Sequence, residues 1–215
     1  MNPKHPRRRF LIGLGLLAGG GGWMRSDAAP QAEAYRYEFE QPNFLITRIL
    51  ITLDATGRGR LEYVEKDVPD LTHAPVALRP ESLLRLQQLA TKAAELSPMP
   101  PSEKHANLGL NKLTLLVNGR SISLAFTYTP NPVLLDLGKF FRGLVTQHQR
   151  VSQIETARRY QPLDMPKLLR DVEADLNGQR IAEPAALAEL FSSLANDLRL
   201  SLIARNHAKR LGDTA

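Results

Sequence analysis

A dipeptide near the middle of the chain, Asn118-Gly119, is the feature that most constrains how these 215 residues can fold. Asn-Gly is the strongest short signal for a β-hairpin, because a two-residue type I′ turn requires positive φ at both central positions. Folding the chain at this turn places Leu113 opposite Leu124 and puts Phe126 on the same apolar face. The other face is mostly polar, so we expect the hairpin to be covered on one side only.

Two stretches upstream alternate apolar and polar residues, as half-buried strands do. The first covers residues 35–39. The second begins at Phe44 and returns through a glycine-containing turn at residues 54–59, which predicts a second hairpin ending at Glu65. Residues 66–77 follow neither period and are predicted to be irregular.

Helical spacing of apolar residues begins at Pro80, a residue that suits the first turn of a helix. After the central hairpin the helical period returns at Asn131, a favourable N-cap, and predicts one long helix to Tyr160. Shorter helices are expected from Asp164 to Asn177 and from Pro184 onward, where Asn196-Asp197 either breaks the helix or caps a last segment, Leu198–Leu211.

These elements predict an α+β fold: an antiparallel sheet of four or five strands with one intervening helix, followed by a C-terminal array of three or four helices. Residues 29–130 would form a β-rich domain, and residues 131–215 a helical region packed on the sheet. The length suits one domain with an appendage, and a hydrophobic content of 43% is enough for a real core.

The basic character of the chain belongs to its first 28 residues. The whole chain has a formal charge of +6, but residues 1–28 carry five of the 28 basic and one of the 22 acidic residues. The remainder, with 23 basic and 21 acidic residues, has a charge of only +2. There is therefore no electrostatic case for a nucleic-acid partner. The absence of cysteine excludes disulfides, thiolate metal sites and thiol catalysis.

Residues 1–28 also have the parts of an export signal: a basic start, a short apolar run, and small residues before a cleavage point after Ala28. The sequence Arg7-Arg8-Arg9-Phe10-Leu11 resembles the R-R-x-F-L motif of twin-arginine export signals, with Arg7 and Arg8 as the pair and Phe10 and Leu11 as the apolar positions. This resemblance implies export of a folded protein to the periplasm or beyond. An ordinary secretory signal and an uncleaved membrane anchor are the alternatives.

Three sequence blocks, ILITLDATGRGRLEY, ESLLRLQQL and LTLLVNGRSISLAF, together resemble small exported bacterial domains of unknown function. The resemblance covers roughly residues 44–141. It implies an exported protein and brings no catalytic residues with it.

No catalytic, cofactor or metal-binding motif is present. The five histidines have no second histidine or carboxylate at metal-ligand spacing, and no glycine-rich fingerprint follows a strand, so no metal and no cofactor are expected. His148 lies near the apolar seam of the long helix and is predicted to be packed and hydrogen-bonded. Asp171, Glu173 and Asp175 diverge around their helix and are expected on a solvated face.

The C-terminal segment has the densest group of polar and basic residues, and two arginines at the end of the long helix could join it. The candidate binding residues are Arg158, Arg159, Arg205, Asn206, His207 and Arg210. Arg205 would bind a carboxylate or phosphate through two hydrogen bonds, and His207 would tune that contact with pH. Leu202, Ile203 and Leu211 are expected to form the buried stripe. The alternative is a solvated helix stabilised by its own dipole.

Two functional hypotheses follow. The favoured one is a non-enzymatic exported module that binds a protein or envelope component through its helical half, touching the membrane only if the leader is not cleaved. The other is an exported hydrolase or transferase whose site is assembled only in three dimensions. A cavity joining His207 or His148 to a carboxylate with a perturbed pKa would favour the enzyme. An exposed apolar groove between the helices would favour the binding module.

Overall fold

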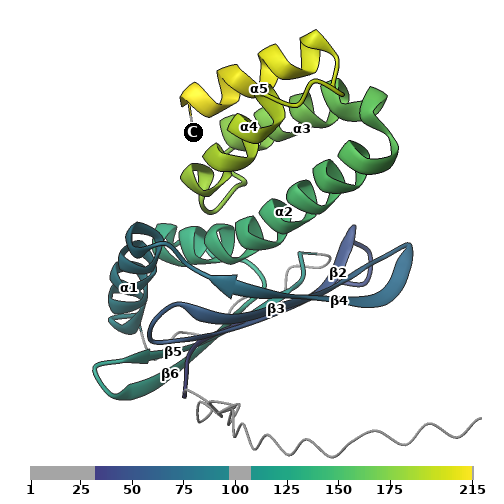
Figure 1. Ribbon diagram of the computed structural model, residues 1–215. Helices are drawn as coiled ribbons and strands as arrows, with labels where there is room; N and C mark the ends of the chain where they lie inside the picture. Colours follow the sequence, from purple (N-terminus) through teal and green to yellow (C-terminus); the bar gives the residue numbers. More distant parts are fainter. Residues whose placement is uncertain (1–31, 97–107, 215) are drawn as a thin grey trace, which may run out of the picture. The chain divides into compact units, whose positions relative to one another are not determined.

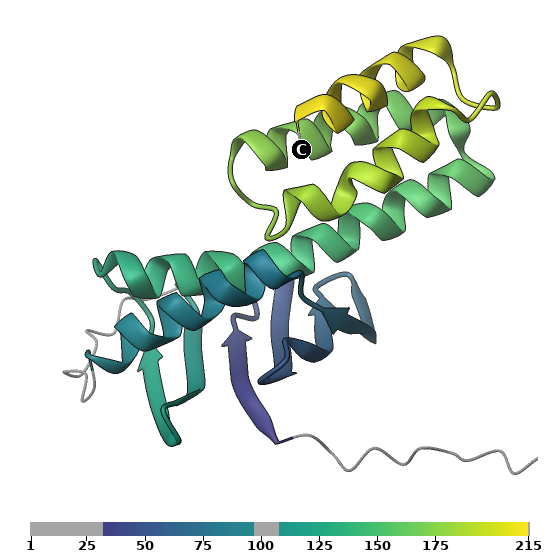
Figure 2. The ribbon, with the colours of Figure 1, turned by 60° about the vertical axis from the view of Figure 1, so that its left-hand side comes forward.

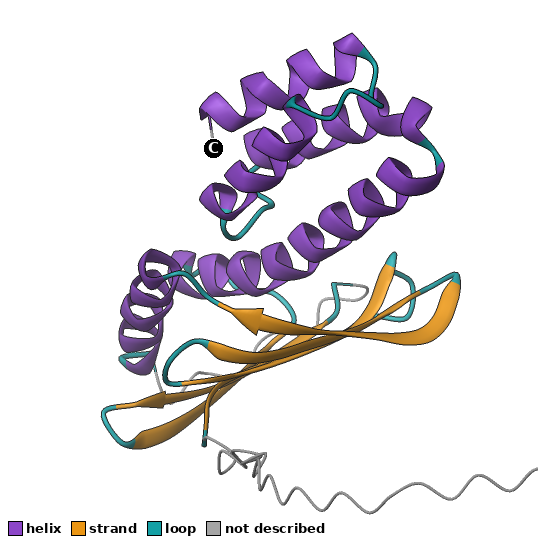
Figure 3. Cartoon of the chain, in the orientation of Figure 1, coloured by secondary structure: helices purple, strands orange, loops and turns teal. Residues whose placement is uncertain are grey.

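The computed structural model describes residues 32–96 and 108–214, which form an α+β structure (Figures 1 and 3). Six antiparallel strands make one sheet in the order β4-β3-β2-β1-β5-β6, and helix α1 separates the first four strands from the last two. The predicted fold class is confirmed, and the sheet has six strands where four or five were expected. The strands are β1 (Glu33–Glu40), β2 (Ile46–Asp54), β3 (Arg58–Glu65), β4 (Val68–Ala77), β5 (Leu110–Val117) and β6 (Arg120–Phe126).

The central hairpin, formed by β5 and β6, has the predicted turn and register. The φ angles of Asn118 and Gly119 are 50° and 74°, the positive values that a type I′ turn requires. Leu113 lies opposite Leu124 as expected. Leu124 and Phe126 are 3% and 4% exposed, so the apolar face predicted from the sequence is the buried one.

The expectation that residues 66–77 are irregular is wrong, because most of them form strand β4, paired antiparallel with β3. This strand lies at the edge of the sheet, where Pro75 is tolerated because one side of an edge strand needs no hydrogen-bond donors. Ala74, opposite Leu61, is a small buried residue. Because β4 buries few large apolar side chains, its sequence lacks the alternation of apolar and polar residues by which a strand is predicted.

Helices α1 (Pro80–Ala94) and α2 (Pro132–Tyr160) cover one face of the sheet, and Figure 2 shows α1 beside the first half of α2. The bounds of α2 agree with the predicted helix. The side chain of Asn131 accepts hydrogen bonds from the amides of Val133 and Leu134, at 3.0 and 3.4 Å, and so caps the helix as expected.

Tyr37, on the central strand β1, joins the sheet to α2. Its ring is fully buried and stacks on Phe141 of α2, with 5.0 Å between ring centroids and 5° between planes. The Tyr37 hydroxyl donates a hydrogen bond of 2.9 Å to Oδ1 of Asn111. Burial raises the pKa of Tyr37 to about 12, so the phenol remains neutral and the bond persists across ordinary pH.

The second half of α2 belongs to a separate apolar core. Ile154 and Ala157 pack there with residues of the three following helices, whereas residues 134–145 contribute to the core under the sheet. Those helices are α3 (Met165–Asn177), α4 (Ala188–Ala195) and α5 (Leu202–Thr214), with 3-10 turns at Pro162–Asp164 and Pro184–Leu187. Asp164 precedes α3 as predicted, but its side chain makes no capping hydrogen bond. Within the described residues, no helix has the length and apolar character needed to cross a membrane.

The last helix differs from its prediction. It begins at Leu202, whereas the predicted last segment began at Leu198, and Leu198 is 82% exposed. Residues 197–200 instead form a turn in which the Leu200 amide donates to the Asp197 carbonyl at 3.0 Å. Leu202 and Ile203 are 62% and 72% exposed, so the expectation that they are buried is also wrong. The helix buries Leu211 as predicted, together with Ala204, His207 and Ala208.

Candidate functional site

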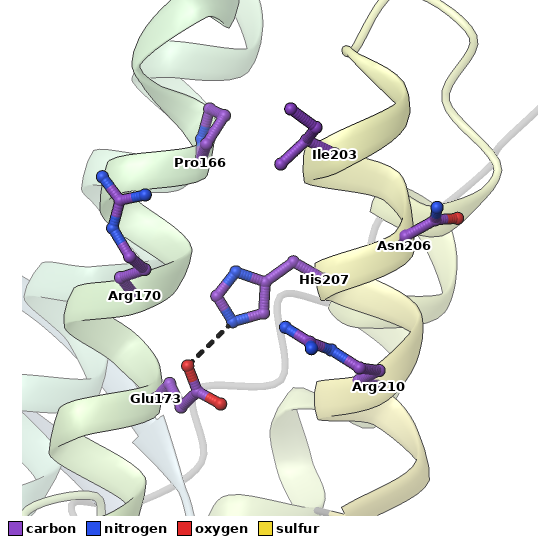
Figure 4. A pocket seen from close by; sticks show the side chains of 7 residues that line it. All are labelled: Pro166, Arg170, Glu173, Ile203, Asn206, His207 and Arg210. Carbon is purple, nitrogen blue, oxygen red and sulfur yellow. Dashed lines mark hydrogen bonds and ion pairs between the residues drawn. The ribbon is translucent and has the colours of Figure 1, made fainter.

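A surface cavity of about 440 Å³ lies between α3 and α5, and Figure 4 shows the side chains that line it. It contains three of the six residues proposed from the sequence, all on α5. The lining residues are Pro166, Arg170 and Glu173 of α3 and Ile203, Asn206, His207 and Arg210 of α5. The two helices therefore supply a mixed wall of cationic, amide and apolar groups.

One ion pair crosses this cavity. Nε2 of His207 lies 3.1 Å from Oε2 of Glu173, and the two side chains are 7% and 45% exposed. His207 is one of the buried residues of α5, so its ring is packed among helices. The Glu173 carboxylate is partly exposed to solvent. Protonated His207 would form a charged pair with Glu173, and neutral His207 can donate a hydrogen bond to it.

Both arginines of the cavity, Arg170 and Arg210, lack a carboxylate partner among the residues that the structure describes. Within residues 32–96 and 108–214, no carboxylate lies at ion-pair distance from Arg170 or Arg210. Glu173, the acidic lining residue, is paired with His207 instead. Two guanidinium groups on facing helices, neither paired with a carboxylate of the described residues, give this wall the chemistry that recognises carboxylates or phosphates.

Arg205 lies on α5 but is not among the lining residues of this cavity. Its side chain is half-buried, and its Nε atom is buried without a hydrogen-bond partner in the described structure. Arg205 and Arg210 were proposed together because they lie on one short segment of the sequence. On the helix they point in different directions, because five residues make about 1.4 turns at 3.6 residues per turn.

Arg158 and Arg159 also lie outside the cavity lining. Arg158 donates from Nε to Oδ2 of Asp197 at 2.7 Å, which ties α2 to the turn before α5. Arg199 also binds Asp197, and Arg199 and Arg158 together hold the pKa of that carboxyl well below its usual range. Arg158 is thus a structural residue, while Arg159 is exposed.

The prediction that the three acidic residues of α3 diverge onto a solvated face is wrong: Glu173 diverges from the other two, but Asp171 and Asp175 both contact Arg150. Asp175 is 4% exposed and accepts hydrogen bonds from Nε of Arg150 at 2.6 Å and Nε of Arg180 at 2.7 Å. Glu173 faces α5 and pairs with His207. Asp171 and Asp175, four residues apart, share Arg150, whose Nη1 lies 3.9 Å from Oδ2 of Asp171, while Glu173 lies against α5.

His148 behaves as the sequence predicts. Its Nδ1 lies 3.3 Å from the Tyr63 hydroxyl, and the two rings meet edge to face at 5.9 Å between centroids. Burial lowers the pKa of His148, which favours the neutral imidazole in this position. These contacts are those of a packing residue.

The sequence analysis missed Arg170 as a site residue. Pro166, Arg170 and Glu173 are spaced at i, i+4 and i+7, so the helical period already places them on one face of α3. That spacing could have shown a common face, but not that the face lies against α5.

Comparisons of the chain with protein-family models, curated proteins and solved structures found no match. Among the residues the structure describes, no group of three or more histidine, aspartate or glutamate side chains could hold a metal ion.

Proposed function

We propose that this protein is an exported, non-enzymatic module that binds an acidic segment of another cell-envelope protein through the α3–α5 cavity. The observation that carries the proposal is the presence on its two walls of Arg170 and Arg210, neither of which has a carboxylate partner in the described part of the chain. Arginine forms paired, planar hydrogen bonds with carboxylates, which suits recognition of Asp or Glu side chains.

Exposed apolar residues beside the cavity support a protein partner over a small anion. Ile203 lines the cavity and is 72% exposed, and its neighbour Leu202 is 62% exposed. Apolar anchors next to arginines are the usual composition of protein-binding surfaces. The partner segment would then carry a large apolar residue close to its carboxylates.

Export is the second part of the proposal and rests on the sequence of residues 1–28. These residues, which include the motif positions Arg7, Arg8, Phe10 and Leu11, lie outside those the structure describes. The twin-arginine resemblance supports a periplasmic or extracellular location, where an envelope partner would be met.

The His207–Glu173 pair gives the enzyme hypothesis its one specific support, because it joins a histidine to a carboxylate beside a cavity. In a hydrolase Glu173 would orient His207 as a general base. The lining residues include no hydroxyl or thiol to serve as a nucleophile, and the His207 side chain is only 7% exposed. These two facts favour binding over catalysis.

The test replaces Arg170 and Arg210 together with glutamate and follows cross-linking from a photoreactive residue at position 203, in cells producing the full chain. We expect the wild-type protein to form a defined adduct that the double variant loses by at least tenfold, because two attractive charges become repulsive. Added salt should also weaken the adduct.

The matched control is Arg48→Glu with Arg120→Glu, two exposed arginines on the sheet that receive the same change of charge. This control should keep the adduct. An adduct that persists in the Arg170 and Arg210 variant would contradict the proposal. Hydrolysis of a small ester or amide that is lost when His207 or Glu173 is replaced would support the enzyme hypothesis instead.

A further inference from the structure

A second cavity, also of about 440 Å³, lies at the other half of the molecule, between the β1–β2 connection and α2. Most of its surface is apolar, and it is separate from the α3–α5 cavity because the two share no lining residue. Its lining residues are Phe39, Phe44, Leu45, Ile46, Ile49, Arg142, Val145 and Thr146. We call this surface the β1–β2 groove.

The floor of the groove is rigid, and its wall is apolar although it faces solvent. Phe39, Ile49 and Val145 form the floor and are at most 3% exposed. Phe44 and Leu45 form the wall and are 41% and 80% exposed. Exposed apolar side chains that line a concave surface mark a binding site more strongly than scattered ones do.

The wall is fixed by main-chain hydrogen bonds, so its exposure does not come from a loose loop. The Lys66 amide donates to the Leu45 carbonyl at 2.9 Å, and the Phe44 amide donates to the Gln41 carbonyl at 3.1 Å. The Phe44 ring also packs on Phe39, with 5.8 Å between centroids. The groove is therefore preformed, which lowers the entropy lost on binding.

Arg142 supplies the charge of the groove. Its guanidinium lies over the Phe39 ring, 5.8 Å from the centroid, and the side chain is half-buried. Within the described residues no carboxylate is at ion-pair distance from it. The neighbouring Thr146 hydroxyl donates to the Arg142 carbonyl at 3.2 Å, so it is already used within the helix.

We propose that the β1–β2 groove binds an aliphatic monocarboxylate, a single-chain fatty acid. One unpaired arginine among apolar lining residues matches a ligand with one negative charge and a hydrocarbon chain. The carboxylate binds Arg142, and the chain covers Phe44 and Leu45. The cavity volume is at the lower end of the range for small-molecule sites, which suits one chain better than two.

An acyl chain fits this lining better than a peptide does. A peptide would bring amide and carbonyl groups that need hydrogen-bond partners when they are covered. The side chains of the groove offer only Arg142 and Thr146 as polar groups. A hydrocarbon chain makes no such demand, and one arginine satisfies the carboxylate.

The test is isothermal titration calorimetry of the full 215-residue protein with decanoate, hexanoate and decanol. Decanoate should bind one to one with a negative heat-capacity change. Hexanoate should bind at least tenfold more weakly, because each buried methylene strengthens binding by up to about fourfold. Decanol, with the same chain length and no charge, should also bind at least tenfold more weakly, because it lacks the charge-assisted contact with arginine.

Two variants separate the charge from the chain. Arg142→Gln should remove the preference for decanoate over decanol, while Arg48→Gln, at an exposed position of β2 outside the groove lining, should keep it. Leu45→Ser should weaken decanoate and decanol equally, since Leu45 is exposed and its loss leaves the fold intact. Leu163→Ser, at a leucine that is 88% exposed against 80% for Leu45 and lies outside the groove lining, should change neither affinity.

Four results would overturn the proposal, and the first two need only the wild-type protein. The first three are the absence of saturable decanoate binding, equal binding of decanoate and decanol, and a preference for decanoate that survives Arg142→Gln. The fourth is displacement of decanoate by a much tighter peptide with an apolar C-terminal residue, which would assign the groove to a protein partner. None of these results depends on the α3–α5 cavity.

Discussion

The central hairpin can be tested through two residues on opposite faces of β6, Phe126 and Ser123. Phe126→Ala removes a ring that is 4% exposed within the core under the sheet, whereas Ser123 is exposed on the open face. Deleting a buried Phe side chain typically reduces the free energy of unfolding by about 3–5 kcal/mol, from lost transfer free energy and the cavity left behind. Ser123→Ala should change it by about 0.5 kcal/mol or less.

The position of Phe126 supports the upper part of that range. Its main-chain carbonyl accepts a hydrogen bond of 3.3 Å from Nδ2 of Asn111, and Oδ1 of Asn111 accepts one from Tyr37. This buried network holds β6 against β5 and β1, so the backbone cannot easily collapse into the space of the ring. For a chain of this size the melting temperature should fall by roughly 2–4 °C per kcal/mol lost.

The assay is urea unfolding followed by far-ultraviolet circular dichroism, with thermal melts as a second measurement. Phe126→Leu keeps part of the buried volume and should give an intermediate loss. Equal effects of the alanine substitutions at Phe126 and Ser123 would refute the reasoning. They would mean that the register is shifted by one residue, which exchanges the two faces of a strand.

Two further predictions concern acid stability and export. Arg199 and Arg158 lower the pKa of Asp197 in the folded state, so the stability from this carboxylate is complete above its unfolded pKa of about 3.9 and is lost as the pH falls toward the depressed value. Asp197→Asn should therefore flatten the loss of stability below about pH 4, and an unchanged acid titration of stability would contradict this. Replacing Arg7 and Arg8 with lysine should stop export of a reporter fused after the leader. Continued export of that variant through the general secretory channel would exclude the twin-arginine route.

Turn and capping residues in the sequence correctly predicted the elements whose structure depends only on residues close by in the chain. The Asn118-Gly119 turn and the Asn131 cap act through φ angles and hydrogen bonds within a few residues, and both are found where they were predicted. Strand β4 was missed because an edge strand with Pro75 is defined by pairing with β3, a contact that its own sequence does not encode.

The candidate site could be predicted only in part for the same reason. The α5 residues Asn206, His207 and Arg210 were found because they are close in sequence. Arg170 and Glu173 belong to the site through the packing of α3 against α5, which the residues of α3 alone do not show. Arg158, by contrast, was proposed as a binding residue but is hydrogen-bonded to Asp197, 39 positions away in the sequence.

The sequence alone determined the α+β class, the turn and register of the central hairpin, and both ends of the long helix, because these depend on residue period and local backbone chemistry. Tertiary structure alone decided which charges remain unpaired. Asp175 and Asp197 take up nearby arginines, whereas Arg142, Arg170 and Arg210 remain without a described carboxylate partner. The physical reason is that ion pairs form over a few ångströms in space, between side chains whose separation in sequence carries no information about that distance.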